Sequence, residues 1–363
     1  MNYIYLFMKK ILLATVLLFM IFACDSNDSE NLKENKILLK TNVIDAEYCK
    51  KTDQLVYISS NPAQVNIFNS NTESLQKISL AYAPTCISIS QDGNTAVVGH
   101  DGHITHVNLK NPSIIQTYDI SCSALDVVLG NNRWAYVFPE KDQWTYIKSV
   151  NMNLEYNYEM PISIYNQLHA GTKGRLHPSG KYIYAQSPLS RGQIQRLTIK
   201  NGNIDDRYES NFEEEDYTIP SIWFSEDGNR LFTRERSVLK TSEINNLDAL
   251  YNGRITSENN YKIDWLDHSS SKGKLYVIFS NGDRWNPTKI NNIYVFNDSD
   301  LSYLNKFDLE KYSNQTKKNS VETYDAVPYF VFSSSTGNRL FIITKAFDSD
   351  LANEWAIQKI NIN

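Results

Sequence analysis

The residues best suited to contact a ligand are Arg, Trp and His side chains in loops between apolar segments. The longest such loop, 281–292, contains Arg284 and Trp285. A guanidinium group donates two parallel hydrogen bonds and an indole ring offers a flat apolar face, so this pair suits a carboxylate, a sugar or a peptide. Further loop residues extend the candidate ligand-binding set: Arg191, Arg234, Arg236, His100 and His103. The alternative is that all of these are solvated loop charges.

A His cluster at 100–106 is the second group that could do chemistry. The Asp-Gly pair between His100 and His103 predicts a two-residue hairpin that brings these rings together, and two His side chains can hold a transition metal. His106 lies three residues beyond His103 along a strand, so it faces the opposite side. This geometry argues against a three-His site, and we predict no metal.

No catalytic constellation is visible in the sequence. The segment Asp267-His268-Ser269 contains hydrolase residue types, but there is no Gly-x-Ser-x-Gly elbow. The acidic run 213–216 could bind Ca²⁺, although consecutive residues rarely converge on one ion, so a solvated loop is the expected role. We therefore predict no catalytic residues and no cofactor.

The composition bounds the class of protein. The chain has 363 residues, of which 41% are hydrophobic and 12% aromatic, including 23 Tyr, which favours strands. The formal net charge is −5. A mildly acidic chain lacks the basic footprint of nucleic-acid binding, so no nucleic-acid partner is expected.

The first 30 residues have the layout of an export signal. Lys9 and Lys10 precede an apolar run at 11–22, then Ala23-Cys24, then the polar segment 25–30. The apolar run of 12 residues is shorter than the ~20 that a spanning helix needs. Met8 is an alternative start, since the residues before it add nothing that the signal needs.

The stretch Ile21-Phe22-Ala23-Cys24 resembles the lipobox of bacterial lipoproteins, although Phe22 replaces the small residue usual at its position. The resemblance implies that 1–23 is a signal peptide and that Cys24 is the first mature residue, carrying acyl chains such as palmitate. Residues 24–35 then form a flexible acidic tether to the membrane. The acidic residues after Cys24 also resemble the export tag of surface lipoproteins, so we expect an outer-membrane protein on either the surface or the periplasmic face. An ordinary signal peptide is the alternative.

Glycine turns recur along the rest of the chain. Gly180 and Gly228 are 48 residues apart, Gly228 and Gly273 are 45 apart, and Gly93 precedes Gly180 by 87, or two periods. Each turn joins two apolar strands, and a tight hairpin of this kind needs a residue with positive φ. The turns are at 90–94, 177–181, 225–229, 271–274 and 335–338, with weaker copies at 51–54 and 130–132.

A repeat of this length with four short strands predicts an all-β propeller in 36–363. Seven turns predict seven blades of four antiparallel strands, with six or eight as alternatives: 44–80, 84–120, 123–160, 173–210, 220–256, 262–309 and 327–362. The leftover segment 36–43 reads as a strand that joins the last blade and closes the ring, leaving no bare sheet edge.

The strand–Ser-x-Asp-Gly-Asn–strand units resemble the seven-bladed WD40/YVTN-like propellers of bacterial secreted proteins. The Trp-Asp and Gly-His signatures of true WD40 blades are missing, apart from a single Gly99-His100. Some relatives of this shape hydrolyse lactones or carry a quinone, but no catalytic motif of theirs is present here. Cys86 and Cys122 begin neighbouring repeats and could form a disulfide; the alternative is that Cys49, Cys86 and Cys122 are small buried apolar residues.

Blade geometry places the candidate ligand-binding residues. Loops between strands two and three, and between blades, lie on one rim, and the glycine turns lie on the other. The first rim should bind: 61–64, 100–103, 140–143, 188–192, 234–237, 281–292 and 347–354. We therefore expect a non-catalytic envelope lipoprotein that binds a protein, peptide or glycan. The alternatives are a propeller enzyme, lactonase-like or quinone- or metal-dependent, and a sensor or assembly component.

Overall fold

The computed structural model describes residues 35–362, except 143, 162, 215–218, 282–287 and 316–320. Residues 36–363 form one compact unit. Among the described residues, the regular secondary structure consists of β-strands and four short 3-10 helices. The helices are at Ile164–Asn166 (η1), Ser190–Gly192 (η2), Asn245–Leu247 (η3) and Glu258–Asn260 (η4). In the described part of the chain, no helix has the length and apolar character needed to cross a membrane.

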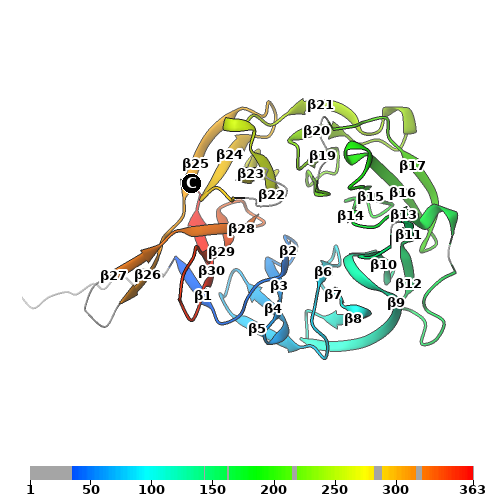
Figure 1. Ribbon diagram of the computed structural model, residues 1–363, viewed down its shortest axis with the longest axis horizontal. Helices are drawn as coiled ribbons and strands as arrows, with labels where there is room; N and C mark the ends of the chain where they lie inside the picture. Colours follow the sequence, from blue (N-terminus) through cyan, green and yellow to red (C-terminus); the bar gives the residue numbers. More distant parts are fainter. Residues whose placement is uncertain are drawn as a thin grey trace, which may run out of the picture. The chain divides into compact units, whose positions relative to one another are not determined.

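The strands form antiparallel sheets that surround a central axis, which is the arrangement of a β-propeller (Figure 1). Four of the sheets each take four consecutive strands. Their members are β2 (Asp45–Cys49), β3 (Gln54–Ser60), β4 (Ala63–Asn69) and β5 (Leu75–Ser79); β14 (Lys173–Leu176), β15 (Tyr182–Gln186), β16 (Ile194–Lys200) and β17 (Asn203–Glu209); β18 (Ile222–Phe224), β19 (Arg230–Thr233), β20 (Ser237–Lys240) and β21 (Leu250–Arg254); β22 (Lys262–Ser269), β23 (Lys274–Ser280), β24 (Asn292–Asn297) and β25 (Tyr303–Asp308).

A fifth four-stranded sheet joins the two ends of the ring. It orders β28 (Ala326–Ser333), β29 (Arg339–Ala346), β30 (Trp355–Asn361) and β1 (Lys36–Leu39). Strand β1 pairs with β30 from Lys36 opposite Gln358 to Leu39 opposite Trp355. The predicted closure by the N-terminal strand is therefore confirmed, and this pairing covers the sheet edge that an open ring would expose.

The remaining large sheet has six strands, in the order β12-β10-β9-β8-β7-β6. Its strands are β6 (Cys86–Ile89), β7 (Thr95–Gly99), β8 (Asp101–Asn108), β9 (Ser113–Leu129), β10 (Trp134–Pro139) and β12 (Lys148–Asn151). Strand β9 pairs with β8 through residues 113–123 and with β10 through residues 124–129. The described residues therefore form six sheets of four or more strands, where the sequence predicted seven blades. The difference arises because β9 continues from one predicted blade into the next, so that strands of both blades belong to one sheet.

Two further sheets have only two strands each. Strands β11 (Trp144–Tyr146) and β13 (Gln167–His169) pair with each other, as do β26 (Tyr312–Gln315) and β27 (Val321–Tyr324). The second of these sheets is a hairpin that projects from the ring (Figure 1). It is the insertion that lengthens the spacing between Gly273 and Gly337 to 64 residues.

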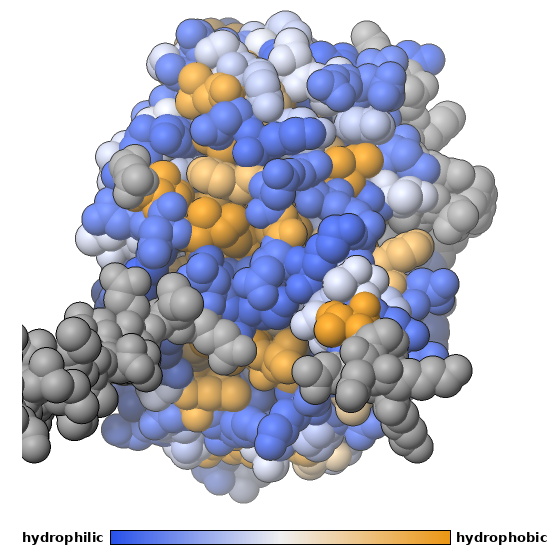
Figure 2. Space-filling model, turned by 90° about the vertical axis from the view of Figure 1, so that its left-hand side faces the viewer, coloured by the Kyte–Doolittle hydropathy of each residue, from blue (hydrophilic) through white to orange (hydrophobic). Residues whose placement is uncertain are grey.

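The core consists of apolar layers between neighbouring sheets. A propeller blade is covered on both faces, so its middle strands read as continuous apolar runs rather than as alternating ones. In β23, every residue from Leu275 to Phe279 is fully buried. The outer wall is mainly hydrophilic, with separated hydrophobic patches (Figure 2).

The glycine turns end the innermost strands as the sequence predicted. Gly228 has φ = 75° and its N–H donates to the Ser225 carbonyl at 2.8 Å. A Cβ at this position would lie 2.8 Å from the His177 ring of the neighbouring sheet. Both the backbone and the packing therefore require glycine here.

Candidate functional site

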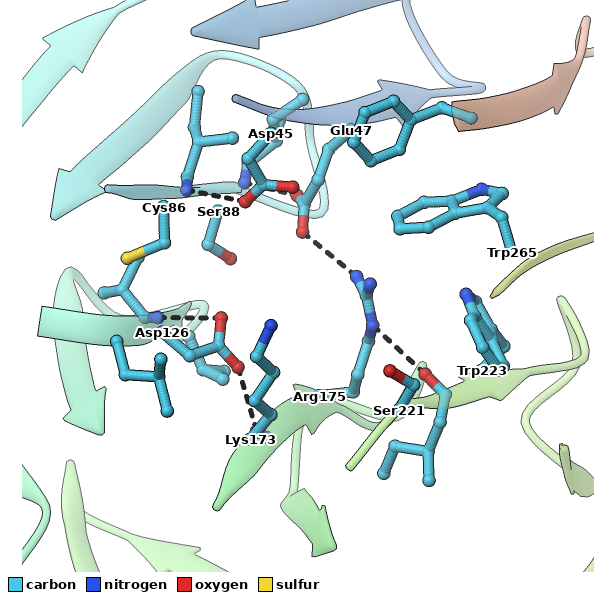
Figure 3. A pocket seen from close by; sticks show the side chains of 18 of the residues that line it. Asp45, Glu47, Cys86, Ser88, Asp126, Lys173, Arg175, Ser221, Trp223 and Trp265 are labelled. Carbon is cyan, nitrogen blue, oxygen red and sulfur yellow. Dashed lines mark hydrogen bonds and ion pairs between the residues drawn. The ribbon is translucent and has the colours of Figure 1, made fainter. Parts of the chain in front are cut away.

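A cavity of about 410 Å³ occupies the centre of the ring. Its lining comes from the innermost strands β2, β6, β9, β14, β18, β22 and β28 (Figure 3). Asp45 and Lys173 are the first residues of β2 and β14. Because each innermost strand starts at the loop-bearing rim and ends at a turn on the opposite rim, these side chains lie toward the loop-bearing rim.

One wall of the cavity is acidic, and its carboxylates tie neighbouring sheets together. Asp45 accepts a hydrogen bond from the N–H of Ile87 at 3.0 Å, and Glu47 accepts one from the N–H of Ile89 at 2.7 Å. Asp126 likewise accepts the N–H of Gly174 at 3.0 Å. The innermost strand of a blade has one edge without a partner strand, so these carboxylates satisfy N–H groups that would otherwise be buried and unpaired.

The same three carboxyls are hard to ionise. Burial raises the pKa of Asp45 and of Asp126 above the ordinary value. Burial also raises the pKa of Glu47 to about 7, against the opposing attraction of Arg175 and the N–H of Ile89. Close to neutral pH this wall therefore exchanges a proton and carries less negative charge than its composition suggests.

Strand β14 contributes two cations to the lining of the cavity. Lys173 is exposed, and its ammonium group points into the middle of the cavity (Figure 3). Within the described residues, no hydrogen bond or ion pair engages that group. Arg175 is engaged: its Nη1 lies 3.3 Å from Glu47 Oε1, and its Nε donates to the Ile222 carbonyl at 3.2 Å. Of these two cations, Lys173 is thus the one that can meet a ligand.

Contacts that cross the ring form a floor beneath the cavity. Glu47 and Arg175, on opposite walls, belong both to this cavity and to a second one of about 290 Å³ on the turn side. Further toward the turns, Lys50 pairs with Glu226, and Gln91 Nε2 donates to the His177 carbonyl at 3.2 Å. The central cavity is therefore entered from the loop-bearing rim, and we call it the cup.

Aromatic side chains complete the lining of the cup. Trp265 lies beneath the Arg175 guanidinium, 5.3 Å from ring centroid to Cζ, and Trp223 packs edge-on against Trp265. The Lys289 ammonium lies 4.7 Å from the centroid of the Tyr329 ring. These contacts use cation–π attraction to hold the cations over apolar surface.

A buried charge cluster supports this aromatic side. Asp264 pairs with Lys289 at 2.9 Å and with Arg234. Burial raises the pKa of Asp264, but Lys289 and Arg234 together outweigh burial and hold that pKa below its usual value. Arg234 thus acts on the cup from behind, by fixing Asp264 and through it Lys289.

The two predicted His residues lie in the tight hairpin that the sequence indicated, away from the cup. His100 is fully buried; its ring contacts the Ala83 carbonyl at 3.1 Å and Thr105 Oγ1 at 2.9 Å. His103 stacks on Tyr82 with ring centroids 3.9 Å apart. The described residues contain no group of three or more His, Cys, Asp or Glu placed to hold a metal ion.

The predicted Arg residues lie at separate places on the loop-bearing rim. Arg234 adjoins the cup, while Arg236 is buried and donates to Ser257 Oγ at 2.9 Å. Arg191 is exposed, in η2. Arg284, Trp285 and Cys24 lie outside the described residues, so their roles stay predictions, as do the binding roles of Arg191, Arg234, Arg236, His100 and His103.

Sequence reasoning missed the charged residues that line the cup. The available indication was spacing: Asp45 and Glu47 are two residues apart, as are Lys173 and Arg175, and in a strand such pairs share one face. Each pair also begins the first strand of a repeat. Cys86 and Cys122, for which a disulfide was one alternative, are free thiols in the structure, as is Cys49.

Comparison with known proteins supports the fold and identifies no family for this chain. No family model matches the chain, and no curated protein matches its sequence. Among solved structures, the β-propeller domain of Cps50 (Swd1) from Myceliophteria thermophila superimposes with a TM-score of 0.64 at 10% identity, covering 90% of this chain and 100% of that one. At this identity the similarity shows a shared fold, and the chain therefore has a WD40-like β-propeller.

Proposed function

We propose that this protein is a non-catalytic binding module of the bacterial cell envelope that engages a protein, peptide or glycan through its loop-bearing rim. The observation that carries the proposal is the cup: it is entered from that rim, and the Lys173 ammonium points into it without a hydrogen bond or ion pair among the described residues. Propellers commonly bind where loops from several blades converge on the central axis.

The charges of the cup favour a ligand group with both donors and acceptors. Asp45 and Glu47 lie across the cavity from the cations Lys173 and Arg175, while Asp126 lies beside Lys173. A simple anion would be repelled by the carboxylates of the cup, and a simple cation would be repelled by the Lys173 ammonium. Neither kind of ligand therefore suits the whole cup. An amide, a hydroxyl-rich sugar ring or a zwitterionic chain end can contact both walls.

Two finer features belong to this proposal. The lipobox-like stretch supports acylation of Cys24, a palmitate-type anchor, and attachment to the outer membrane. The two pairing halves of β9 support counting the six-stranded sheet as two blades that share a strand, which gives seven blades in all. Seven innermost strands contribute to the lining of the cup, in keeping with that count.

Substitution within the cup tests the binding function. We expect Lys173→Met to weaken capture of the native partner by roughly tenfold or more, since a charged hydrogen bond is worth about 1.5–3 kcal/mol. Lys51→Met, which removes an exposed ammonium on the turn rim, is the matched control. The measurement is quantitative affinity purification from detergent-extracted membranes. Equal recovery of partners by both variants would exclude the cup from binding.

The raised pKa of Glu47 favours a second candidate, an enzyme that uses acid–base chemistry in the cup, such as a lactonase-like hydrolase. A carboxyl with a pKa of about 7 can both give and take a proton near neutral pH. This alternative predicts turnover of a lactone or ester panel that disappears in Glu47→Gln. Absence of turnover by the unaltered protein would exclude the enzyme. If Lys173→Met also loses partner capture, the binding module is the function that both results support.

A further inference from the structure

An apolar surface lies on the rim opposite the cup. Between β20 and β21 the chain forms a loop, 241–249, that contains η3. The loop and the start of β21 together expose four apolar side chains: Ile244 (58% exposed), Leu247 (48%), Leu250 (45%) and Tyr251 (62%). We call these four residues the apolar loop. Single exposed apolar residues are ordinary, but four within eight positions mark an interaction surface.

The apolar loop is held in place by a buried ion pair. Arg196 Nη1 lies 3.1 Å from Asp248 Oδ2, and these side chains are 4% and 1% exposed. Asp248 Oδ1 also accepts hydrogen bonds from the Tyr184 hydroxyl at 2.7 Å and from the N–H of Ser242 at 2.9 Å. Arg196 contacts the Asn245 side chain as well. The exposure of the apolar side chains is thus imposed by a rigid support and does not reflect a loop without packing.

The apolar loop belongs to the turn rim. The N–H of Thr241 donates to the Asn229 carbonyl at 3.1 Å, beside the glycine turn at Gly228. Strand β20 ends at Lys240, opposite Arg230, which directly follows the same turn. The loop therefore extends from the rim that does not carry the entrance to the cup.

The first strand of the propeller starts toward the same rim. Strand β1 runs from Lys36, opposite Gln358, to Leu39, opposite Trp355, and Trp355 begins β30 at the loop-bearing rim. The N-terminal end of β1 is therefore directed toward the turn rim. Lys36 follows Cys24 by 12 positions, and a chain of this length spans at most about 40 Å. In the ring, β1 is at the lower left and β21 at the top (Figure 1).

We propose that the apolar loop contacts the lipid surface to which Cys24 is attached. This inference rests on the proposed acyl anchor. Aliphatic side chains with a neighbouring Tyr match the boundary between headgroups and acyl chains, where Tyr places its ring in apolar surroundings and its hydroxyl in water. The N-terminal end of β1 and the apolar loop are both directed toward the turn rim, so in this proposal the turn rim lies on the membrane and the cup opens away from it.

Quenching by brominated lipid tests the contact. The acylated full-length protein is reconstituted into vesicles of phosphatidylethanolamine and phosphatidylglycerol at 3:1, with and without brominated acyl chains. The probe is Tyr251→Trp. The matched control is Phe347→Trp, because Phe347 is also 62% exposed but follows β29 on the loop-bearing rim. We expect brominated lipid to quench the added emission of Tyr251→Trp at least twofold and to leave that of Phe347→Trp unchanged.

The outcomes separate this inference from the proposed anchor. Adding Ile244→Ser and Leu247→Ser to the probe protein should reduce the quenching while leaving the melting temperature unchanged, since both side chains are exposed. Equal quenching of both probes, or none in protein that floats with the vesicles, overturns the lipid contact and leaves the anchor standing. Protein that does not float with the vesicles overturns both. Shielding of Tyr251→Trp by a co-purifying protein instead of lipid also overturns the contact.

Discussion

Replacing Glu47 with Gln should stabilise the protein, and the gain should grow with pH. Burial raises the pKa of Glu47 from 4.5 to about 7 in the folded protein. Between these values the folded state holds a proton that the unfolded state has released, so stability falls as the pH rises through this window. A pKa difference of one between the folded and unfolded states corresponds to about 1.4 kcal/mol, which gives a loss of about 3 kcal/mol by pH 8.

Glutamine resembles the neutral form of the carboxyl and does not titrate. The free energy of unfolding of Glu47→Gln relative to the unaltered protein should therefore increase by about 3 kcal/mol between pH 4.5 and pH 8. Urea denaturation of both proteins at pH 4.5, 6 and 8 measures this difference. Glu155→Gln, at an exposed position, is the control, and its effect should change by less than about 0.5 kcal/mol over the same range.

A constant difference between Glu47→Gln and the unaltered protein across this range would refute the reasoning. It would mean that the carboxyl ionises in the cup as readily as in water, and that the Glu47–Arg175 contact of 3.3 Å compensates fully for burial. A loss of stability that grows with pH would contradict the sign of the argument. The expected result would identify Glu47 as a residue that costs stability at neutral pH, which is typical of functional positions.

Three further predictions concern buried polar groups. Burial lowers the pKa of His106 to about 4 and, within the described residues, neither ring nitrogen has a hydrogen-bond partner. The free energy of unfolding should therefore fall by about 3 kcal/mol as the pH drops from 6.5 to 4. His106→Phe should abolish this pH dependence in urea titrations. Asp126→Ala leaves the N–H of Gly174 unpaired, so it should unfold about 1–3 kcal/mol more easily than Asp126→Asn, which keeps an acceptor; equal midpoints would contradict the tie between sheets. Arg196→Met leaves the Asp248 carboxylate buried without its cation and should cost about 3–5 kcal/mol in thermal or chemical denaturation, whereas a loss under 1 kcal/mol would show that the ion pair does not hold the apolar loop.

Much of the architecture could be predicted because its turns are chemically explicit. A glycine such as Gly228 is required by both φ and packing, so the repeat period can be read from the sequence. The strand that closes the ring was also predictable, because residues 36–39 were left over once the repeats were assigned. The continuous strand β9 was not, since the segment 113–129 contains no Gly or Pro that would show whether the chain turns between the two predicted blades or continues as one strand.

The candidate site could be predicted far less well. Candidates chosen for exposure in loops include His100 and Arg234, which the structure buries. The cup depends instead on Glu47 and Arg175, which are 128 residues apart in the chain and meet only when the ring closes. Such a contact leaves no local pattern, although the paired charges at the start of a repeat were a usable indication.

The most direct test of this account is a photocrosslinking amino acid placed in living cells at the position of Lys173 and, separately, at that of Lys51. Both side chains are exposed, but Lys173 lines the cup and Lys51 lies on the turn rim. We expect ultraviolet light to produce a discrete partner adduct from the Lys173 position and none of the same mass from the Lys51 position. The same adduct from both positions, or from Lys51 alone, would contradict binding through the cup.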